Sequence, residues 1–157
     1  VFLVDDELLR TLNQARSRLP DRSLWSFENT EIVGARLSLA EGDTNLDLVQ
    51  IDADLPEDAR WARSADVAKK APEIESWIAT MLKLNGSSYL GPDEKLEDPK
   101  ELFSVTFGTE DGRNQTVRII KDGENWWATS QHTRGYLKLV GAKVQPLVDQ
   151  VVILIEG

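Results

Sequence analysis

The chain has 157 residues, with 27 acidic and 18 basic side chains, a formal net charge of −9 and an isoelectric point of about 4.6. A hydrophobic fraction of 41% with 29% charged residues is typical of a globular protein, and excludes a disordered, collagenous or coiled-coil chain. The negative charge argues against binding to nucleic acid or to an anionic membrane surface, because both need clustered lysines and arginines. Without cysteine there are no disulfides, thiol nucleophiles or thiolate metal sites.

The N-terminal part of the chain predicts a helix followed by a hairpin. The helix carries apolar residues at helical spacing and ends at Pro20; these residues are Leu8, Leu9, Leu12, Ala15 and Leu19. Between Val33 and Leu39 apolar residues alternate with others, which is typical of a strand with one buried face. A second strand is predicted from Leu46 to Ile51, and a short strand around Trp61 follows.

A second helix is predicted to open with Pro72 in its first turn and to stop at Asn85-Gly86. Its apolar stripe consists of Ile74, Trp77, Ile78, Met81 and Leu82. The stretch 91–99 is polar and bounded by prolines, so it is predicted to be a linker.

Beyond residue 99, four strands are predicted near 102–107, 115–120, 126–130 and 136–140. The turns between the first three contain Asp111-Gly112 and Asp122-Gly123, which tolerate the positive φ of tight hairpins, so an antiparallel meander is expected. A helix over about 142–151 and a strand-like run over 152–155 complete the sequence. The apolar run 151–155 is predicted to pair into the sheet or to be buried against another copy.

The two halves of the chain show a short internal similarity. Trp61-Ala62-Arg63-Ser64 resembles Trp127-Ala128-Thr129-Ser130, and each follows a predicted apolar hairpin. We therefore predict an α+β fold of two related units, residues 1–90 and 100–157, each an antiparallel meander covered by an amphipathic helix. One compact domain built from repeats fits the same pattern.

Several of these features resemble a bacterial family, the domain-of-unknown-function 4340 family. The similar parts are Val1-Phe2-Leu3-Val4-Asp5 before a leucine-rich helix, Trp61 followed by Ala65-Asp66, the hairpin around Glu110-Asp111-Gly112, and Tyr136-Leu137-Lys138-Leu139. The resemblance implies a membrane-anchored protein with a repeated extracytoplasmic α+β region, often encoded beside ABC transporters of the gliding-motility type. It implies no catalytic residues, and the family's N-terminal anchor has no counterpart in these 157 residues.

Signatures of catalysis and of metal binding are weak. The sequence contains no phosphate-binding glycine loop, nucleophile elbow or zinc-protease helix motif. The single histidine, His132, lies in a predicted loop, where a solvated side chain is the usual interpretation. Residues 43–47 resemble the start of a calcium loop, but Leu48 and Asp54 stand where glycine and glutamate are required. We therefore predict neither enzyme activity nor a metal or other cofactor.

The adjacent tryptophans Trp126 and Trp127 should point to opposite faces of their strand. By analogy with Trp61, Trp127 is expected in the core, which leaves Trp126 either on the outer face or under the C-terminal helix. If exposed, Trp126 would mark a binding surface together with neighbouring cations, which are Arg118, Arg134 and Lys138. Packing of both tryptophans against helices is the alternative.

The function predicted from the sequence is that of a non-catalytic interaction or scaffolding module with a protein partner. The family resemblance adds an extracytoplasmic location and a membrane transporter complex as that partner. No nucleic acid is expected to bind, and the longest apolar run is too short for this fragment to insert into a membrane. The alternative is a small-ligand or glycan-binding domain that uses an exposed tryptophan face.

Overall fold

The computed structural model describes residues 21–52, 55 and 59–157, so the predicted helix over Leu8–Leu19 lies outside the described residues. A short 3-10 helix, η1 (Asn29–Glu31), precedes the sheet. The strands are β1 (Ile32–Leu39), β2 (Asn45–Ile51), β3 (Arg60–Arg63), β4 (Ser88–Tyr89), β5 (Lys100–Thr109), β6 (Asn114–Asp122), β7 (Asn125–Ser130) and β8 (Leu137–Leu139). The helices are α2 (Pro72–Leu82) and α3 (Gly141–Glu156).

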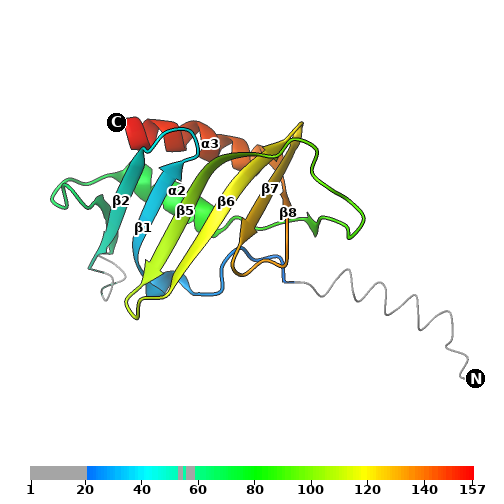
Figure 1. Ribbon diagram of the computed structural model, residues 1–157. Helices are drawn as coiled ribbons and strands as arrows, with labels where there is room; N and C mark the ends of the chain where they lie inside the picture. The colour runs from blue at the N-terminus through cyan, green and yellow to red at the C-terminus, as the bar shows by residue number, and fades with distance from the viewer. Residues whose placement is uncertain (1–20, 53–54, 56–58) are drawn as a thin grey trace, which may run out of the picture.

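The strands form one eight-stranded sheet in the order β3-β2-β1-β5-β6-β7-β8-β4, and all neighbours are antiparallel (Figure 1). The meander β5-β6-β7 is confirmed. Its turns contain Gly112 with φ 83° and Gly123 with φ 56°, the left-handed backbone that glycine adopts without strain.

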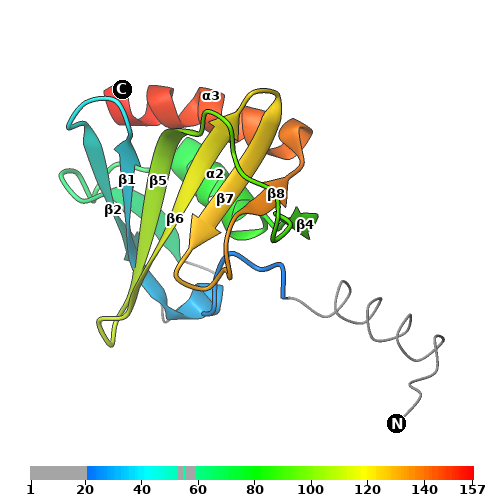
Figure 2. The same ribbon diagram turned by 45° about the vertical axis from the view of Figure 1, so that its right-hand side comes forward.

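Both helices lie on the same face of this sheet (Figures 1 and 2). The predicted stripe of α2 is confirmed, since Ile74, Trp77, Ile78 and Met81 are all buried. The indole Nε1 of Trp77 donates a 3.0 Å hydrogen bond to the backbone oxygen of Leu147 in α3, which joins the two helices inside the core. The α+β class with a large antiparallel sheet is therefore correct.

The predicted two-unit repeat is not confirmed. Strand β1 pairs along most of its length with β5, so the two halves of the chain share one sheet and one core. The tryptophans matched by the repeat also face opposite ways: Trp61 lies in the core, whereas its match Trp127 lies outside the core cluster and Trp126 lies within it. A shift of one residue along a strand exchanges the two faces, so the four-residue similarity does not align equivalent positions.

The end of the chain differs from the prediction. Helix α3 continues to Glu156, and residues 152–155 do not form a strand. The β-branched run suggested a strand, but Val151, Leu154 and Ile155 are buried at the i, i+3, i+4 spacing of a helix. The run is thus partly buried, as expected, but through a helical face against the sheet.

The stretch 91–99, predicted to be a linker, crosses the sheet face opposite the helices between β4 and β5 (Figure 2). The carboxylate of Asp122 accepts hydrogen bonds from the backbone N–H groups of Glu97 at 3.1 Å and Asp98 at 2.7 Å. Leu96 and Trp127 line the same groove under this stretch, which we call the strap. The strap covers one end of the otherwise open outer face.

The segment 21–27 closes one end of the core. Leu24, Trp25 and Phe27 are buried, and the Trp25 ring meets that of Phe107 edge-on at 4.8 Å between centroids. The Ser130 hydroxyl donates to the Leu24 backbone oxygen at 2.8 Å. This segment has no repeating apolar pattern, so its place in the core has no signal in the sequence.

Candidate functional site

The structure places Trp126 in the core cluster and Trp127 outside it, which corrects the expectation that Trp127 is the core member of the pair. Its side chain is 7% exposed and lies under the first turn of α3, where a Cβ atom added to Gly141 would stand 3.0 Å from its Cδ1 atom. The Nζ atom of Lys121 lies 4.8 Å from the ring centre. Of the two positions predicted for Trp126, the structure selects the one under the C-terminal helix.

The three cations predicted to accompany Trp126 do not surround it. Arg118 alternates with core residues of β6 and therefore faces the outer side, where its Nε atom lies 3.6 Å from Glu101. Lys138 pairs with Trp127 in the sheet, and its Nζ atom lies 5.8 Å from that ring. Arg134 is exposed in the loop between β7 and β8. These residues do not form one site with Trp126.

An exposed tryptophan face, which the ligand-binding alternative requires, is missing. All five tryptophans fall among the described residues, and none is more than 8% exposed. Trp127 lines a groove of about 540 Å³ beneath the strap, but its Nε1 atom is buried and has no hydrogen-bond partner. No indole ring is therefore presented for stacking on a sugar.

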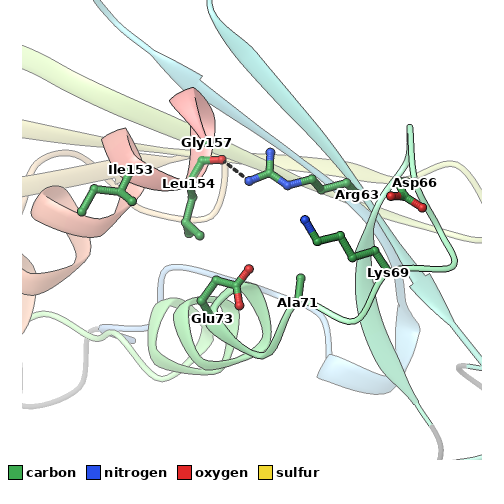
Figure 3. Close-up of a pocket in the computed structure, with 8 residues that line it drawn as sticks. All are labelled: Arg63, Asp66, Lys69, Ala71, Glu73, Ile153, Leu154 and Gly157. Carbon is green, nitrogen blue, oxygen red and sulfur yellow. Dashed lines mark hydrogen bonds between the residues drawn. The ribbon is translucent and has the colours of Figure 1, made fainter.

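A small cavity of about 220 Å³ lies where the first turn of α2 meets the last turn of α3 (Figure 3). Its lining combines apolar and charged side chains from β3, the following loop and both helices: Arg63, Asp66, Lys69, Ala71, Glu73, Ile153, Leu154 and Gly157. We call this cavity and its rim the helix-end site. It gathers residues that lie about 80 to 90 positions apart in the sequence.

Arg63 joins the two sides of the helix-end site. Its Nη2 atom donates a 2.7 Å hydrogen bond to the backbone oxygen of Leu154 (Figure 3). The last turn of α3 contains no basic residue of its own, so Arg63 supplies the positive charge that a helix C-terminus favours. On the other side, Glu73 lies in the first turn of α2, where the helix dipole favours an acid.

Two residues of the site have side chains without the contacts that usually accompany them, an ion pair for a lysine and burial for an isoleucine. Lys69 makes no ion pair with any residue in the described part of the chain, and in Figure 3 its ammonium group extends into the space between the two helix ends. Ile153 is 69% exposed, the highest value among the exposed large hydrophobic side chains of the described residues, and Val152 beside it is also exposed.

The sequence pattern does not predict the helix-end site, because residues 152–155 have the β-branched composition of a strand but form the end of α3. A helical wheel drawn over Val151, Leu154 and Ile155 would have left Ile153 on the opposite side, facing solvent. The involvement of Lys69 had no signal in the sequence, because it depends on the long-range contact between Arg63 and Leu154.

His132 takes part in a structural contact. Its Nε2 atom lies 2.9 Å from Oδ2 of Asp21. Hydrogen bonds from Ser23, and then the contact with His132, lower the pKa of Asp21 from 3.8 to about 2. The Tyr89 hydroxyl donates to the backbone oxygen of Asp21 at 2.8 Å, so these contacts together fasten the start of segment 21–27.

A second polar cluster lies at the turn between β5 and β6. Arg113 forms ion pairs of 2.7 Å with both Glu31 and Asp111. In the described ranges 21–52, 55 and 59–157, no group of three or more histidine or acidic side chains is arranged to hold a metal ion. The cluster therefore joins η1 to the β5-β6 turn by ion pairing.

Comparisons with known proteins give no further guide, since no family model, no curated protein and no solved structure matches the chain. Over the described residues, each helix is too short or too polar to cross a bilayer.

Proposed function

We propose that the chain is a non-catalytic interaction module that docks a protein partner at the helix-end site. The observation that carries this proposal is the 69% exposure of Ile153 directly beside a cavity whose inner wall is apolar. Covering an aliphatic side chain that a helix holds in water is favourable. It stabilises the complex by about 25 cal/mol for each Å² of apolar surface removed from water.

The composition of the helix-end site supports protein docking. Ala71 and Leu154 are buried and form the inner wall, and Ile153 extends that apolar surface outward. Charged side chains, Lys69 and Glu73 among them, form the rim. Protein interfaces commonly have this arrangement, with an apolar centre that accepts an anchor side chain and a polar rim that stays partly wet.

The proposal includes the cellular setting implied by the family resemblance. The partner would then be a subunit of a membrane transporter complex, and the module would lie on the extracytoplasmic side. These two points rest only on the resemblance, whereas the position of the docking surface rests on the geometry of Ile153 and its cavity. The ligand-binding alternative is not favoured, because no tryptophan face is exposed.

Affinity capture with surface variants tests this proposal. The tagged chain, an Ile153→Asp variant and an Ala142→Asp variant are each used to capture proteins from cells that produce the chain, with solubilised membranes included. Ala142 is a matched control, because it is an exposed apolar residue on the same helix, eleven residues and therefore about 16 Å away.

We expect a bound protein that is retained by the wild type and by Ala142→Asp and is lost with Ile153→Asp. Ile153 is mostly exposed, but an aspartate in the last turn of α3 opposes the helix dipole, so its replacement should lower the free energy of unfolding by about 1 kcal/mol, which denaturation followed by circular dichroism checks. Equal capture by all three chains, or capture by none, would contradict the proposal.

A further inference from the structure

The charges around the helix-end site bear on the chemistry of the partner that the proposed function requires. Four charged side chains line the cavity: Arg63, Asp66, Lys69 and Glu73. Two of them already have a favourable neighbour, since Arg63 donates to the last turn of α3 and Glu73 lies in the first turn of α2. The side chains of the other two, Asp66 and Lys69, extend in different directions.

Of these two residues, Lys69 is the one whose charged group extends into the cavity (Figure 3). Asp66 and Lys69 are the first and last residues of a four-residue turn, in which the Lys69 backbone N–H donates to the Asp66 backbone oxygen at 3.3 Å. In Figure 3 the Lys69 side chain extends toward the cavity between Arg63 and Glu73, whereas Asp66 lies beyond Arg63 on the far side. The Lys69 ammonium group and the Arg63 guanidinium therefore lie next to each other, with Glu73 across the cavity from them (Figure 3).

The apolar wall of the cavity indicates a second feature of the partner, an aliphatic side chain. Ala71, Leu154 and Ile153 line the cavity next to these cations. A volume of about 220 Å³ accommodates one aliphatic side chain and not a second domain or an extended polymer. Lysine in such a setting favours a group of opposite charge on the partner, because an ammonium group that loses water at an interface costs free energy unless a partner charge compensates it.

Resting on the proposed function, we propose that the partner inserts an aliphatic side chain against Ile153 and Leu154 and presents a carboxylate, from an adjacent aspartate, glutamate or chain end, to Lys69. The aliphatic group supplies affinity through burial, and the carboxylate fixes the direction in which the partner lies. A chain of net charge −9 repels other acidic proteins at long range, so a partner carboxylate is attracted only close to Lys69 and Arg63, and this restricts which acidic surface binds.

Zero-length cross-linking with a water-soluble carbodiimide tests the carboxylate directly, because this reagent joins an amine only to a carboxyl group in contact with it. The complex captured by the wild-type chain is treated and digested, and the linked peptides are identified by mass spectrometry. Labelling the bait with ¹⁵N separates links within one chain, links between two copies and links to another protein.

We expect Lys69 to be linked to an acidic residue or a chain end of the partner. Lys69→Glu should weaken capture by more than about tenfold, and Lys69→Arg should leave it within about threefold. Lys143→Gln, at an exposed lysine near the start of α3, is the matched control and should change nothing.

The outcomes separate this inference from the function on which it rests. Suppose that Ile153→Asp abolishes capture, but Lys69 is not linked to a partner and Lys69→Glu leaves capture unchanged. The helix-end site then binds a protein, and the proposal of a partner carboxylate at Lys69 is overturned. A link from Lys69 to Glu73 of the same chain in the complex, or to a second copy of the chain, also overturns it. If Ile153→Asp leaves capture intact, or nothing is captured, the function itself fails and the inference fails with it.

Discussion

The Arg63 guanidinium in β3 donates a 2.7 Å hydrogen bond to the Leu154 carbonyl in the last turn of α3, 91 residues later in the chain. This bond joins the edge strand β3 to the end of α3, and the two form part of the wall of the helix-end site. It also satisfies a carbonyl that has no partner within the helix, because the last four carbonyls of a helix lack one.

Replacing Arg63 by methionine should therefore loosen the last turn of α3. We expect a loss of about 1 to 2 kcal/mol in the free energy of unfolding, together with faster amide exchange at the end of the helix. Chemical denaturation and hydrogen exchange measure the two effects. Arg118→Met is the control, since Arg118 is exposed and has only a 3.6 Å ion pair, and it should change stability by no more than about 0.5 kcal/mol. Equal effects of both variants would argue against a helix-capping role for Arg63.

The burial of Trp126 leads to a second prediction. Trp126→Ala should cost about 3 to 5 kcal/mol, because it removes a core side chain packed under α3 and leaves a cavity. Urea denaturation followed by circular dichroism gives this value. A change below about 1 kcal/mol would mean that the indole is exposed, as the binding surface predicted around it would require.

Sequence patterns predicted those parts of the fold in which neighbouring positions decide the structure. Alternation along β1 predicted that strand, the turns at Gly112 and Gly123 predicted the β5-β6-β7 meander, and the apolar stripe predicted α2. The end of α3 was missed because β-branched residues favour strands locally, whereas packing on the sheet favours a helix.

The candidate site was harder to predict than the fold, because distant residues build it. The contact between Arg63 and Leu154 has no local signature, and the exposure of Ile153 depends on the helical state of the residues around it. The condition for a binding surface at Trp126, an exposed indole, is not met. The analogy with Trp61 placed Trp127 in the core, but it was displaced by one residue, which exchanges inner and outer faces.

The contacts of Asp21 predict a loss of stability in acid. The pKa of Asp21 is lowered to about 2, first by hydrogen bonds from Ser23 and then by His132. A lowered pKa means that the charged carboxylate stabilises the folded state above about pH 4, and that this contribution disappears as the pH falls toward 2. The Tm of the wild type should exceed that of Asp21→Asn at pH 7, and the difference should vanish near pH 2. A difference that is constant with pH would contradict the assignment.

The strap over the outer face depends on Asp122. Asp122→Ala removes the acceptors of the Glu97 and Asp98 backbone N–H groups. We expect these two amides to exchange faster with solvent, and stability to fall by on the order of 1 kcal/mol. Glu124→Ala, at an exposed acid of the same hairpin, is the control. Unchanged exchange at both amides would show that other contacts hold the strap.

Hydrogen exchange of the captured complex tests the central claim most directly, because it locates the partner without any substitution. Compared with the free chain, the complex should show slower exchange in residues 64–75 and 150–157, which surround the helix-end site, and no change in β1 or β5. Slower exchange confined to β1, β5 and β6 would place the partner on the outer face of the sheet and would contradict docking at the helix ends.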